Sequence, residues 1–335
     1  MAPLRIVFLG SDAIALPLLD WLAGEGSEIG RVIAVYTQPD RAVGRGQKVG
    51  PNAIKTWALA REIPVYQPEK ITDEVRGHYA TLGADVALVM AYGHILRENF
   101  IGTPRLGTFN LHTSILPRYR GASPIQTAVA CGERETGVAF MRMVLKLDAG
   151  PVADVERVAI APLDTALEVE GKLATACVPL VRRALPAVRD ETIACAPQDE
   201  TAATFCRKLE KDDGALDFSA PAAVLAARIN GLFPWPACSV EIAGQAVKFG
   251  QAEVVAGECH TLYDNVAGAG VVLGSDAEGL AMGTGAGVLR VRRLQRPGGR
   301  MLPAAEFLRG FPIAPGTVIA SRPMRPLVAS TPFRK

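Results

Sequence analysis

Apolar segments rich in β-branched residues alternate with helical segments along the first half of the chain. This alternation is typical of a parallel sheet covered by helices. A helix is predicted over residues 15–23, which are rich in Leu and Ala and end near Gly24 and Gly26. The predicted strands are Leu4–Gly10, Arg31–Tyr36, Pro64–Tyr66, Asp85–Met90 and Gly107–Leu111.

The α/β pattern continues to about residue 190. Two more β-segments are expected at Thr136–Met143 and Val152–Ile160. Thr165 and Glu168 form a candidate capping box, which predicts a helix to about Leu185. The polar segment 191–205 has no clear period and is interpreted as a linker. We therefore predict one α/β domain over residues 1–190.

The pattern changes after residue 206 to short β-rich runs separated by glycine. The runs are SVEIAGQAVKFG, AGVVLGS and AGVLRVRRL. Several short strands with glycine at their ends favour a small barrel or sandwich. A second domain over residues 206–330 agrees with a chain of 335 residues, which is long enough for two moderate domains.

Composition narrows the class of protein further. Hydrophobic residues make up 49% and charged residues 21%, which is ordinary globular usage. The six cysteines lack the spacing of a zinc site or a disulfide framework, so we expect no metal and a reducing compartment. No run reaches the roughly 18 apolar residues of a membrane span. We expect a cytoplasmic protein without membrane contact.

Charge is distributed unevenly along the chain. Residues 206–335 carry a net charge of +4 and the remainder −2, which sum to the net +2 of the whole protein. An excess of this size is compatible with polyanion binding and equally with a solvated surface. The turn after Gly10 is not GxGxxG, and no GxxxxGK[ST] loop is present. The first absence removes most of the support for a nicotinamide enzyme, and the second leaves nucleoside triphosphate binding unsupported.

Candidate chemistry gathers where two predicted strands end. Asn110 and His112 are two residues apart in FNLHTS, so an extended chain presents both on one side. An amide and an imidazole together can stabilise charge on a carbonyl oxygen in acyl transfer. Asp148, in KLDAGPV after another strand, can orient the imidazole or accept a proton. Taken singly, each also fits a structural role: a His tied to a backbone carbonyl, a turn-forming Asn, and an Asx-turn.

In this chain NLHTSILPRYRGASPIQ is followed by KLDAGPV, and these two segments resemble the signature of the folate-dependent formyltransferases. The resemblance covers nearly the whole chain, and the TQPDR loop and FPWP segment are similar to those of the members specific for tRNA. Other matching segments, in order, are RIVFLGSD, TQPDRAVGRGQKVGP, VMAYGHIL, ETGVAFMRM, KLEKDDGALDF and INGLFPWPACSVEIAG. The resemblance implies a Rossmann-like, mostly parallel sheet domain followed by a small OB-like β-barrel domain.

The resemblance also implies an activity: formyl transfer from 10-formyltetrahydrofolate to the amino group of methionyl initiator tRNA, which prepares the tRNA for translation initiation. Its implied catalytic residues are Asn110, His112 and Asp148, with His112 as acid, base or oxyanion donor. The implied folate contacts are Ser114, Ile115, Leu116 and Pro117. Ala91, Tyr92 and Gly93 are expected to line the pterin pocket, although Tyr92 fits a plain core residue equally well.

Basic residues in both domains are candidates for tRNA contact. The glycine-rich loop at 37–50 cannot form a stable helix or a central strand, and its cations suit a polyanionic substrate or a solvated surface. The tRNA candidates are Arg41, Arg45, Lys48, Arg290, Arg292 and Arg293. Two alternatives remain: an amino-sugar or sugar-nucleotide N-formyltransferase with the same donor, and a catalytically silent RNA-binding protein. We expect a monomer that does not bind DNA.

Overall fold

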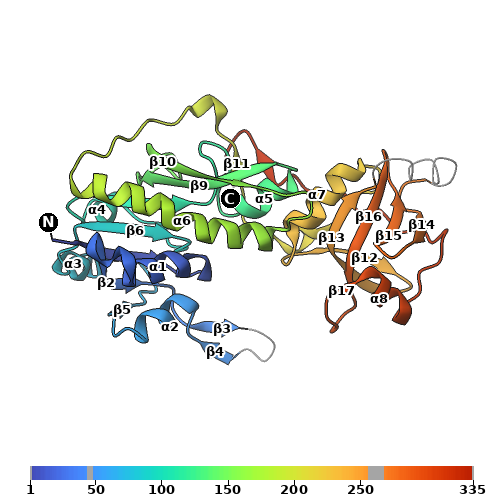
Figure 1. The fold of residues 1–335 in the computed structure, drawn as a ribbon, viewed down its shortest axis with the longest axis horizontal. Helices are drawn as coiled ribbons and strands as arrows, with labels where there is room; N and C mark the ends of the chain where they lie inside the picture. The colour runs from blue at the N-terminus through green and yellow to red at the C-terminus, as the bar shows by residue number, and fades with distance from the viewer. Residues whose placement is uncertain (1, 44–47, 256–267, 334–335) are drawn as a thin grey trace. The chain divides into compact units, whose positions relative to one another are not determined.

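The computed structural model describes residues 2–43, 48–255 and 268–333, and divides them into two compact units. The first unit comprises residues 1–120, 137–158 and 170–203. The second comprises residues 121–136, 159–169 and 204–335. Figure 1 shows the chain coloured from the N-terminus to the C-terminus.

The first unit is built on a seven-stranded sheet in the order β10-β9-β7-β6-β1-β2-β5. Five neighbouring strands are parallel, from β7 to β5, and β9 runs antiparallel to β7. This confirms the predicted open, mostly parallel sheet. The strands are β1 (Leu4–Gly10), β2 (Gly30–Tyr36), β5 (Val65–Tyr66), β6 (Val86–Met90), β7 (Thr108–His112), β9 (Glu135–Arg142) and β10 (Val152–Ala159).

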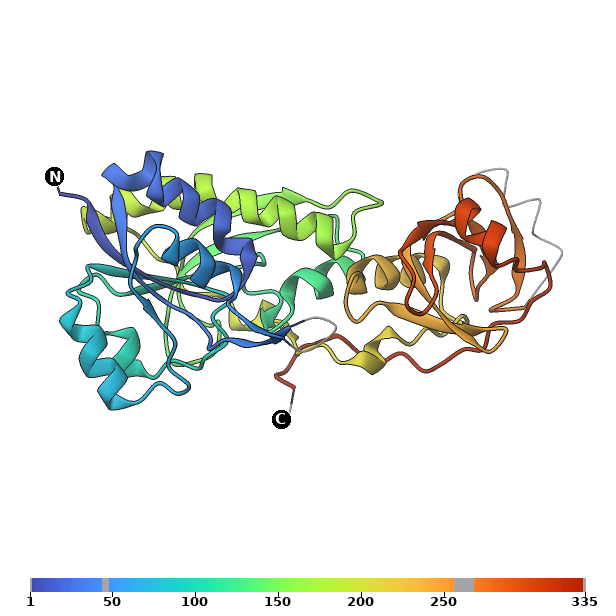
Figure 2. The same ribbon diagram turned by 90° about the horizontal axis from the view of Figure 1, so that it is seen from below.

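Helices cover both faces of this sheet, because its central strands are apolar on both sides. Val7 and Leu9 pack on the side of α3 and α4, with Tyr79 and Phe100. On the other side, Cys177 of α6 contacts Met90 of β6. Figure 2 shows α1 (dark blue) and α6 (yellow-green) on the face opposite α3. The helices are α1 (Leu16–Ala23), α2 (Ala53–Leu59), α3 (Asp73–Thr81), α4 (Glu98–Ile101) and α6 (Ala166–Arg189).

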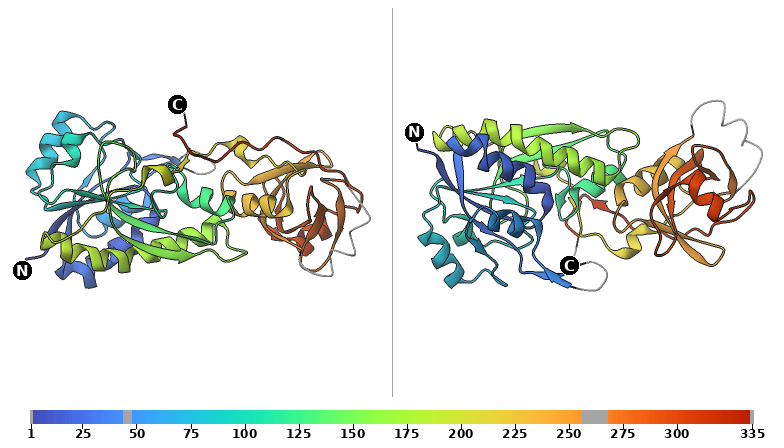
Figure 3. Two further views of the ribbon diagram at one scale, coloured as in Figure 1. Left: turned by 90° about the horizontal axis from the view of Figure 1, so that it is seen from above. Right: turned by 60° about the horizontal axis from the view of Figure 1, so that its bottom comes forward.

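The second unit contains a curled antiparallel sheet in the order β12-β13-β16-β15-β14, with β17 paired to β16 (Figure 3). Helix α7 packs on β13 and β16, and its Leu225 and Ile229 enter the apolar core of this unit. The elements of the sheet are β12 (Cys238–Ile242), β13 (Gln245–Val254), β14 (Val272–Ser275), β15 (Leu280–Gly283), β16 (Val288–Gln295) and β17 (Leu302–Pro303). The helices are α5 (Pro124–Ala130), α7 (Ala222–Leu232) and α8 (Ala304–Gly310).

Short elements complete the described structure. Within the glycine-rich segment, β3 (Arg41–Val43) and β4 (Lys48–Gly50) pair as a two-stranded sheet, separate from the large sheet as the composition predicts. A three-stranded sheet holds β8 (Arg120–Gly121), β11 (Phe205–Cys206) and β18 (Val328–Ala329). The 3-10 helices are Ala13–Ala15, Glu25–Glu28, Glu200–Ala202 and Lys211–Gly214. None of the helices described is long and apolar enough to cross a membrane.

The segment interpreted as a linker is extended and attached to the first unit along part of its length. Ala196 forms an antiparallel bridge with Val152, through hydrogen bonds in both directions. The polar composition of this segment gave no period, because its contacts are hydrogen bonds to distant residues rather than an apolar face. The proposed domain limits at residues 190 and 206 remain a prediction.

Candidate active site

The parallel strands of the first unit end at one edge of the sheet. Gly10, Tyr36, Met90 and His112 are the last residues of β1, β2, β6 and β7. Open α/β sheets bind ligands beyond the carboxyl ends of their strands, where loops are free to diverge. The predicted site residues around 41, 91–93 and 110–117 all follow or end strands at this edge.

Asn110 and His112 lie on β7 and share one face of that strand, because they are two residues apart. Asn110 is half-buried and pairs with Val89 of β6. The His112 side chain is only 6% exposed, and its Nε2 lies 3.0 Å from the carbonyl oxygen of Tyr119. Since a carbonyl can only accept, Nε2 carries the proton and donates. In the neutral form of the ring, the lone pair is therefore at Nδ1, where the ring can accept a proton.

Asp148 faces that nitrogen. Its Oδ2 lies 3.9 Å from Nδ1 of His112, and its side chain is 11% exposed. The distance is too long for a direct hydrogen bond but close enough for a carboxylate to stabilise an imidazolium. The structure thus places His112, at the end of β7, beside Asp148, in the loop after β9 (Glu135–Arg142), and puts Asn110 on the same face of β7 as His112.

The loop that carries Asp148 turns tightly. The backbone of Asp148 is left-handed, with φ of +48°, which a residue other than glycine adopts at a cost in free energy. A Cβ atom at Gly150 would lie 1.8 Å from the carbonyl oxygen of Arg142. Glycine is therefore required at position 150, because no side chain fits where the loop returns to β9.

The predicted folate segment forms a compact turn after β7. The hydroxyl of Ser114 is buried and donates to the carbonyl oxygen of Arg118, at 2.6 Å. Leu116 is also buried, whereas Ile115 and Pro117 are half-buried. The Ser114 side chain thus holds the turn together, and a ligand here would meet the backbone and the apolar side chains.

The second predicted folate segment follows β6. Ala91 and Gly93 are exposed and both have positive φ, whereas the Tyr92 side chain is buried with Tyr79 and Phe100 in the core. Burial raises the pKa of the Tyr92 hydroxyl. The carbonyl oxygen of Tyr92 accepts from Ser11 and Gln38. The side chain of Tyr92 therefore belongs to the core, and the segment offers a ligand its backbone.

The arginine loop begins with a set of hydrogen bonds. The guanidinium of Arg41 is exposed and donates from Nη2 to Oε1 of Gln38, at 2.8 Å. Lys55 and Gln67 bond Asp40, and the Lys55 hydrogen bond in particular lowers the pKa of that carboxyl. Lys48 belongs to β4. Arg45 lies outside the described residues.

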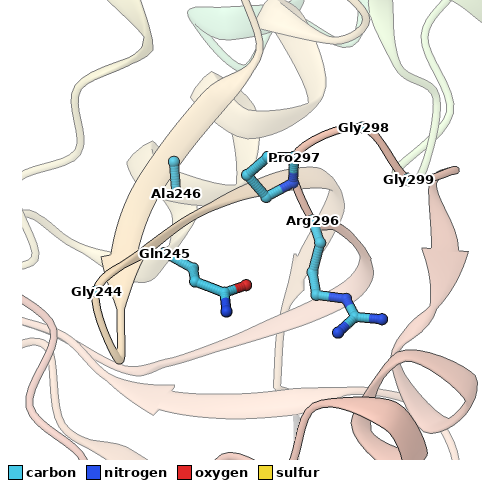
Figure 4. A pocket seen from close by; sticks show the side chains of 7 residues that line it. All are labelled: Gly244, Gln245, Ala246, Arg296, Pro297, Gly298 and Gly299. Carbon is cyan, nitrogen blue, oxygen red and sulfur yellow. The ribbon is translucent and has the colours of Figure 1, made fainter.

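The three arginines predicted on β16 have different surroundings. The side chain of Arg290 is 10% exposed and forms ion pairs with Asp276 and Glu278. Arg292 pairs with Glu253 at 2.9 Å, whereas Arg293 is exposed. A shallow pocket in the same unit lies between Gln245 and Arg296 (Figure 4). It is lined by Gly244, Gln245, Ala246, Arg296, Pro297, Gly298 and Gly299.

Three polar residues near Asp148 were missed by the sequence reasoning. Arg120 is fully buried, although it stands in the polar run Arg118-Tyr119-Arg120. It bonds Gln198 and Glu200, which lie in the segment interpreted as a linker. The polar residues of that segment carried no local signal, since their partners are 78 and 80 residues away.

Among the described residues, no group of His, Cys, Asp and Glu could hold a metal ion.

Comparison with known proteins agrees with this fold. The family model described as formyl transferase matches residues 4–185, and the formyl transferase C-terminal domain matches residues 208–312. The methionyl-tRNA formyltransferase of Ectopseudomonas mendocina is 40% identical over 94% of this chain and 98% of its own length. That of Parvibaculum lavamentivorans is 40% identical over 95% of this chain and 100% of its own length.

A solved structure shares the fold at much lower identity. The N-formyltransferase from Helicobacter canadensis, in complex with folinic acid and dTDP-3-aminofucose, has a TM-score of 0.62. It is 16% identical and covers 88% of this chain and 99% of its own. The fold, the polar trio at the sheet edge and the two family matches define a formyl-group transferase. Among such enzymes, its relatives of 37–40% identity over nearly the whole chain place it plainly: the chain belongs to the methionyl-tRNA formyltransferases.

Proposed function

We propose that this protein transfers the formyl group of 10-formyltetrahydrofolate to the amino group of methionyl initiator tRNA, with Asn110, His112 and Asp148 as its catalytic residues. The observation that carries this assignment is the buried imidazole of His112, which donates from Nε2 to the backbone and presents Nδ1 to Asp148 at 3.9 Å. Asn110 lies on the same face of β7. One amide donor and one proton acceptor are the groups that acyl transfer to an amine requires.

The reaction follows from these groups. The methionyl amine attacks the formyl carbon, and the carbonyl oxygen becomes an oxyanion that the Asn110 amide stabilises by donating a hydrogen bond. Nδ1 of His112 takes the proton that the attacking nitrogen loses, and the Asp148 carboxylate stabilises the imidazolium. The bond from the formyl carbon to N10 of the folate then breaks. The proton held by His112 goes to N10, and formylmethionyl-tRNA and tetrahydrofolate leave.

The two substrates are assigned to different segments at the edge of the sheet. We assign the donor to the turn Ser114–Pro117 and to the backbone of Ala91, Tyr92 and Gly93, because these segments offer peptide groups and apolar side chains to a flat heterocycle. The acceptor is assigned to Arg41, Arg45 and Lys48 of the glycine-rich loop. The names of the relatives support tRNA rather than DNA as the nucleic acid partner.

In the second unit, Arg293 is the best candidate for a tRNA phosphate contact among the three predicted arginines. Its side chain is exposed, whereas Arg290 and Arg292 already bind carboxylates. An arginine that is fully engaged by carboxylates adds little net attraction for a phosphate, because its charge is compensated. We therefore propose a structural role for Arg290 and Arg292, and phosphate contact for Arg293.

A direct assay tests the activity. Purified protein is incubated with 10-formyltetrahydrofolate and either methionyl initiator tRNA or an amino-sugar nucleotide, and formylated product is measured. Transfer to the tRNA alone is expected, since the sugar enzyme compared above is only 16% identical. Transfer to the sugar nucleotide alone would replace the proposal with its alternative.

All three catalytic residues come from one chain, so we also propose that a monomer is active. Light scattering during turnover would check this oligomeric state.

Arg41→Ala should weaken the use of tRNA and leave folate affinity unchanged. Removal of one phosphate contact is the physical reason, because Arg41 is exposed and its hydrogen bond to Gln38 is local. The measurements are the KM for methionyl-tRNA and the Kd for tetrahydrofolate. Equal losses in both would place this side chain in the folate pocket.

Arg293→Ala should reduce the salt dependence of tRNA binding. Each phosphate contact contributes about 0.7 to 0.9 to the slope of log affinity against log salt, through the release of counterions. Arg290→Ala on the same strand is the matched control, since it leaves the carboxylates of Asp276 and Glu278 without their partner. The control should lower thermal stability and keep the wild-type slope. An unchanged slope for Arg293→Ala would make that residue a solvated surface arginine.

A further inference from the structure

We propose that Gln198, held in place by Arg120, is a positioning residue that fixes the backbone of the Asp148 loop for catalysis. Nε2 of Gln198 donates to the carbonyl oxygen of Asp148 at 2.8 Å and to that of Gly150 at 2.7 Å. One amide group therefore holds both ends of the turn that carries the carboxylate. The proposal rests on the proposed function, in which Asp148 stabilises the His112 imidazolium.

Arg120 determines which way the amide of Gln198 points. Its Nε and Nη2 donate to Oε1 of Gln198, at 3.0 and 2.8 Å. A guanidinium has only donors, so the amide oxygen must face it. The NH2 group is then directed at the two carbonyls, where both of its hydrogens are used. Hydrogen bonds at both the oxygen and the nitrogen of its amide thus fix the orientation of Gln198.

The charge of Arg120 is balanced within the same network. Its side chain is fully buried, and it forms a bidentate pair with Glu200 through Nη1 and Nη2, at 3.2 and 2.9 Å. The hydrogen bonds from Arg120 and from Lys146 lower the pKa of Glu200 to about 2, which keeps this carboxylate charged. Lys146 is itself part of the loop and binds Glu200 at 2.6 Å. The loop is therefore held at three points: the backbone of Asp148, the backbone of Gly150 and the side chain of Lys146.

Arg120 is also adjacent in sequence to the residue that binds His112. Arg120 follows Tyr119, whose carbonyl oxygen accepts the hydrogen bond from Nε2 of His112. Tyr119 and Asp148 both have left-handed backbones, with φ of +60° and +48°. Such conformations persist only where the surroundings hold them. Arg120 and Gln198 provide that support on both sides of the 3.9 Å gap between His112 and Asp148.

Gln198→Glu is the decisive variant because it has the same shape as the native side chain. A glutamate keeps an oxygen for Arg120 and strengthens that pair, but it presents a second acceptor to the carbonyls of Asp148 and Gly150. We expect kcat to fall about 100-fold, because a displacement of about 1 Å at a reacting group can have this effect. The KM values for folate and tRNA should change less than about 2-fold. A wild-type kcat in Gln198→Glu would overturn the proposal.

The matched control is Asp199→Ala. Asp199 is the next residue along the chain, and its carboxylate accepts hydrogen bonds locally, from Thr201. This variant should keep the wild-type kcat, and its melting temperature should equal that of Gln198→Glu. An equal loss of kcat in Asp199→Ala would mean that any disturbance of the segment matters, and the specific role of Gln198 would be rejected.

A double-mutant cycle separates positioning from general stability. If Gln198 acts only through Asp148, then Gln198→Ala should lower kcat about 100-fold in the wild type and less than about 2-fold in the Asp148→Ala background. Fully multiplicative losses would overturn the proposal. Failure of the wild-type protein to formylate methionyl-tRNA would reject the proposed function instead, so the two failures are distinguishable.

Discussion

His112→Ala is expected to slow formyl transfer about 100- to 1000-fold, the range found when one catalytic hydrogen-bonding group is removed from an acyl-transfer site. The imidazole lies 3.9 Å from the carboxylate of Asp148, and its loss removes the proton acceptor. Asn110→Ala should produce a loss of similar size through the oxyanion. Single-turnover kinetics with saturating substrates would measure both.

Folding must be shown to survive these changes. His112 is buried against the carbonyl of Tyr119, so a modest fall in melting temperature is expected for its variant. His78→Ala is the control: His78 is exposed on α3 and contacts the ring of Tyr66. It should retain wild-type turnover. A folded His112→Ala protein with near-normal turnover would show that the imidazole is structural.

Gly150→Ala is expected to abolish most of the activity, by about 100-fold or more, although the added group is a single methyl. Its Cβ would lie 1.8 Å from the carbonyl oxygen of Arg142, so the backbone of the Asp148 loop must move. A shift of about 1 Å in the carboxylate is enough for such a loss. The free energy of unfolding should fall by about 1–3 kcal/mol, as for other overpacked sites. Kinetics and urea unfolding would measure the two effects.

Gly171→Ala is the matched control for that substitution. Gly171 lies in α6, and nothing comes within 4 Å of the Cβ that alanine would add. Alanine in a helix is favoured over glycine by roughly 0.5–1 kcal/mol, so this variant should be slightly more stable and fully active. If Gly150→Ala behaved in the same way, the tight return of the loop to β9 would be of no consequence for catalysis.

Local pattern predicted most of the first unit. Strand β1 was predicted at its observed limits, Leu4–Gly10. The predicted limits of the other strands of the large sheet either match the observed limits or differ from them by one residue. Burial on both faces produces continuous apolar runs, which are visible in the sequence alone. The trio of Asn110, His112 and Asp148 was also predictable, because polar residues at the ends of such runs stand out.

The roles of the arginines on β16 could be predicted only in part. Alternation places Arg290 and Arg292 on one side of the strand and Arg293 on the other. It does not reveal that Glu253 of β13 and Asp276 of the turn after β14 lie beside the first two. Those carboxylates approach through strand pairing, so the run of arginines in the sequence does not by itself show how many of them are available to a polyanion.

The distinction between sequence and tertiary structure is clearest around Asp148. The order of residues determined the strands and indicated the polar side chains at their ends, since both depend on neighbours a few positions away. The need for glycine at position 150 became visible only in the folded structure, where the loop returns to Arg142. Only the folded structure shows that Gln198 binds the backbone of Asp148 and that the buried Arg120 binds Gln198. Hydrogen bonds between segments 50 and 78 residues apart leave no period in either segment, because they depend on where two backbones meet after the sheet has formed.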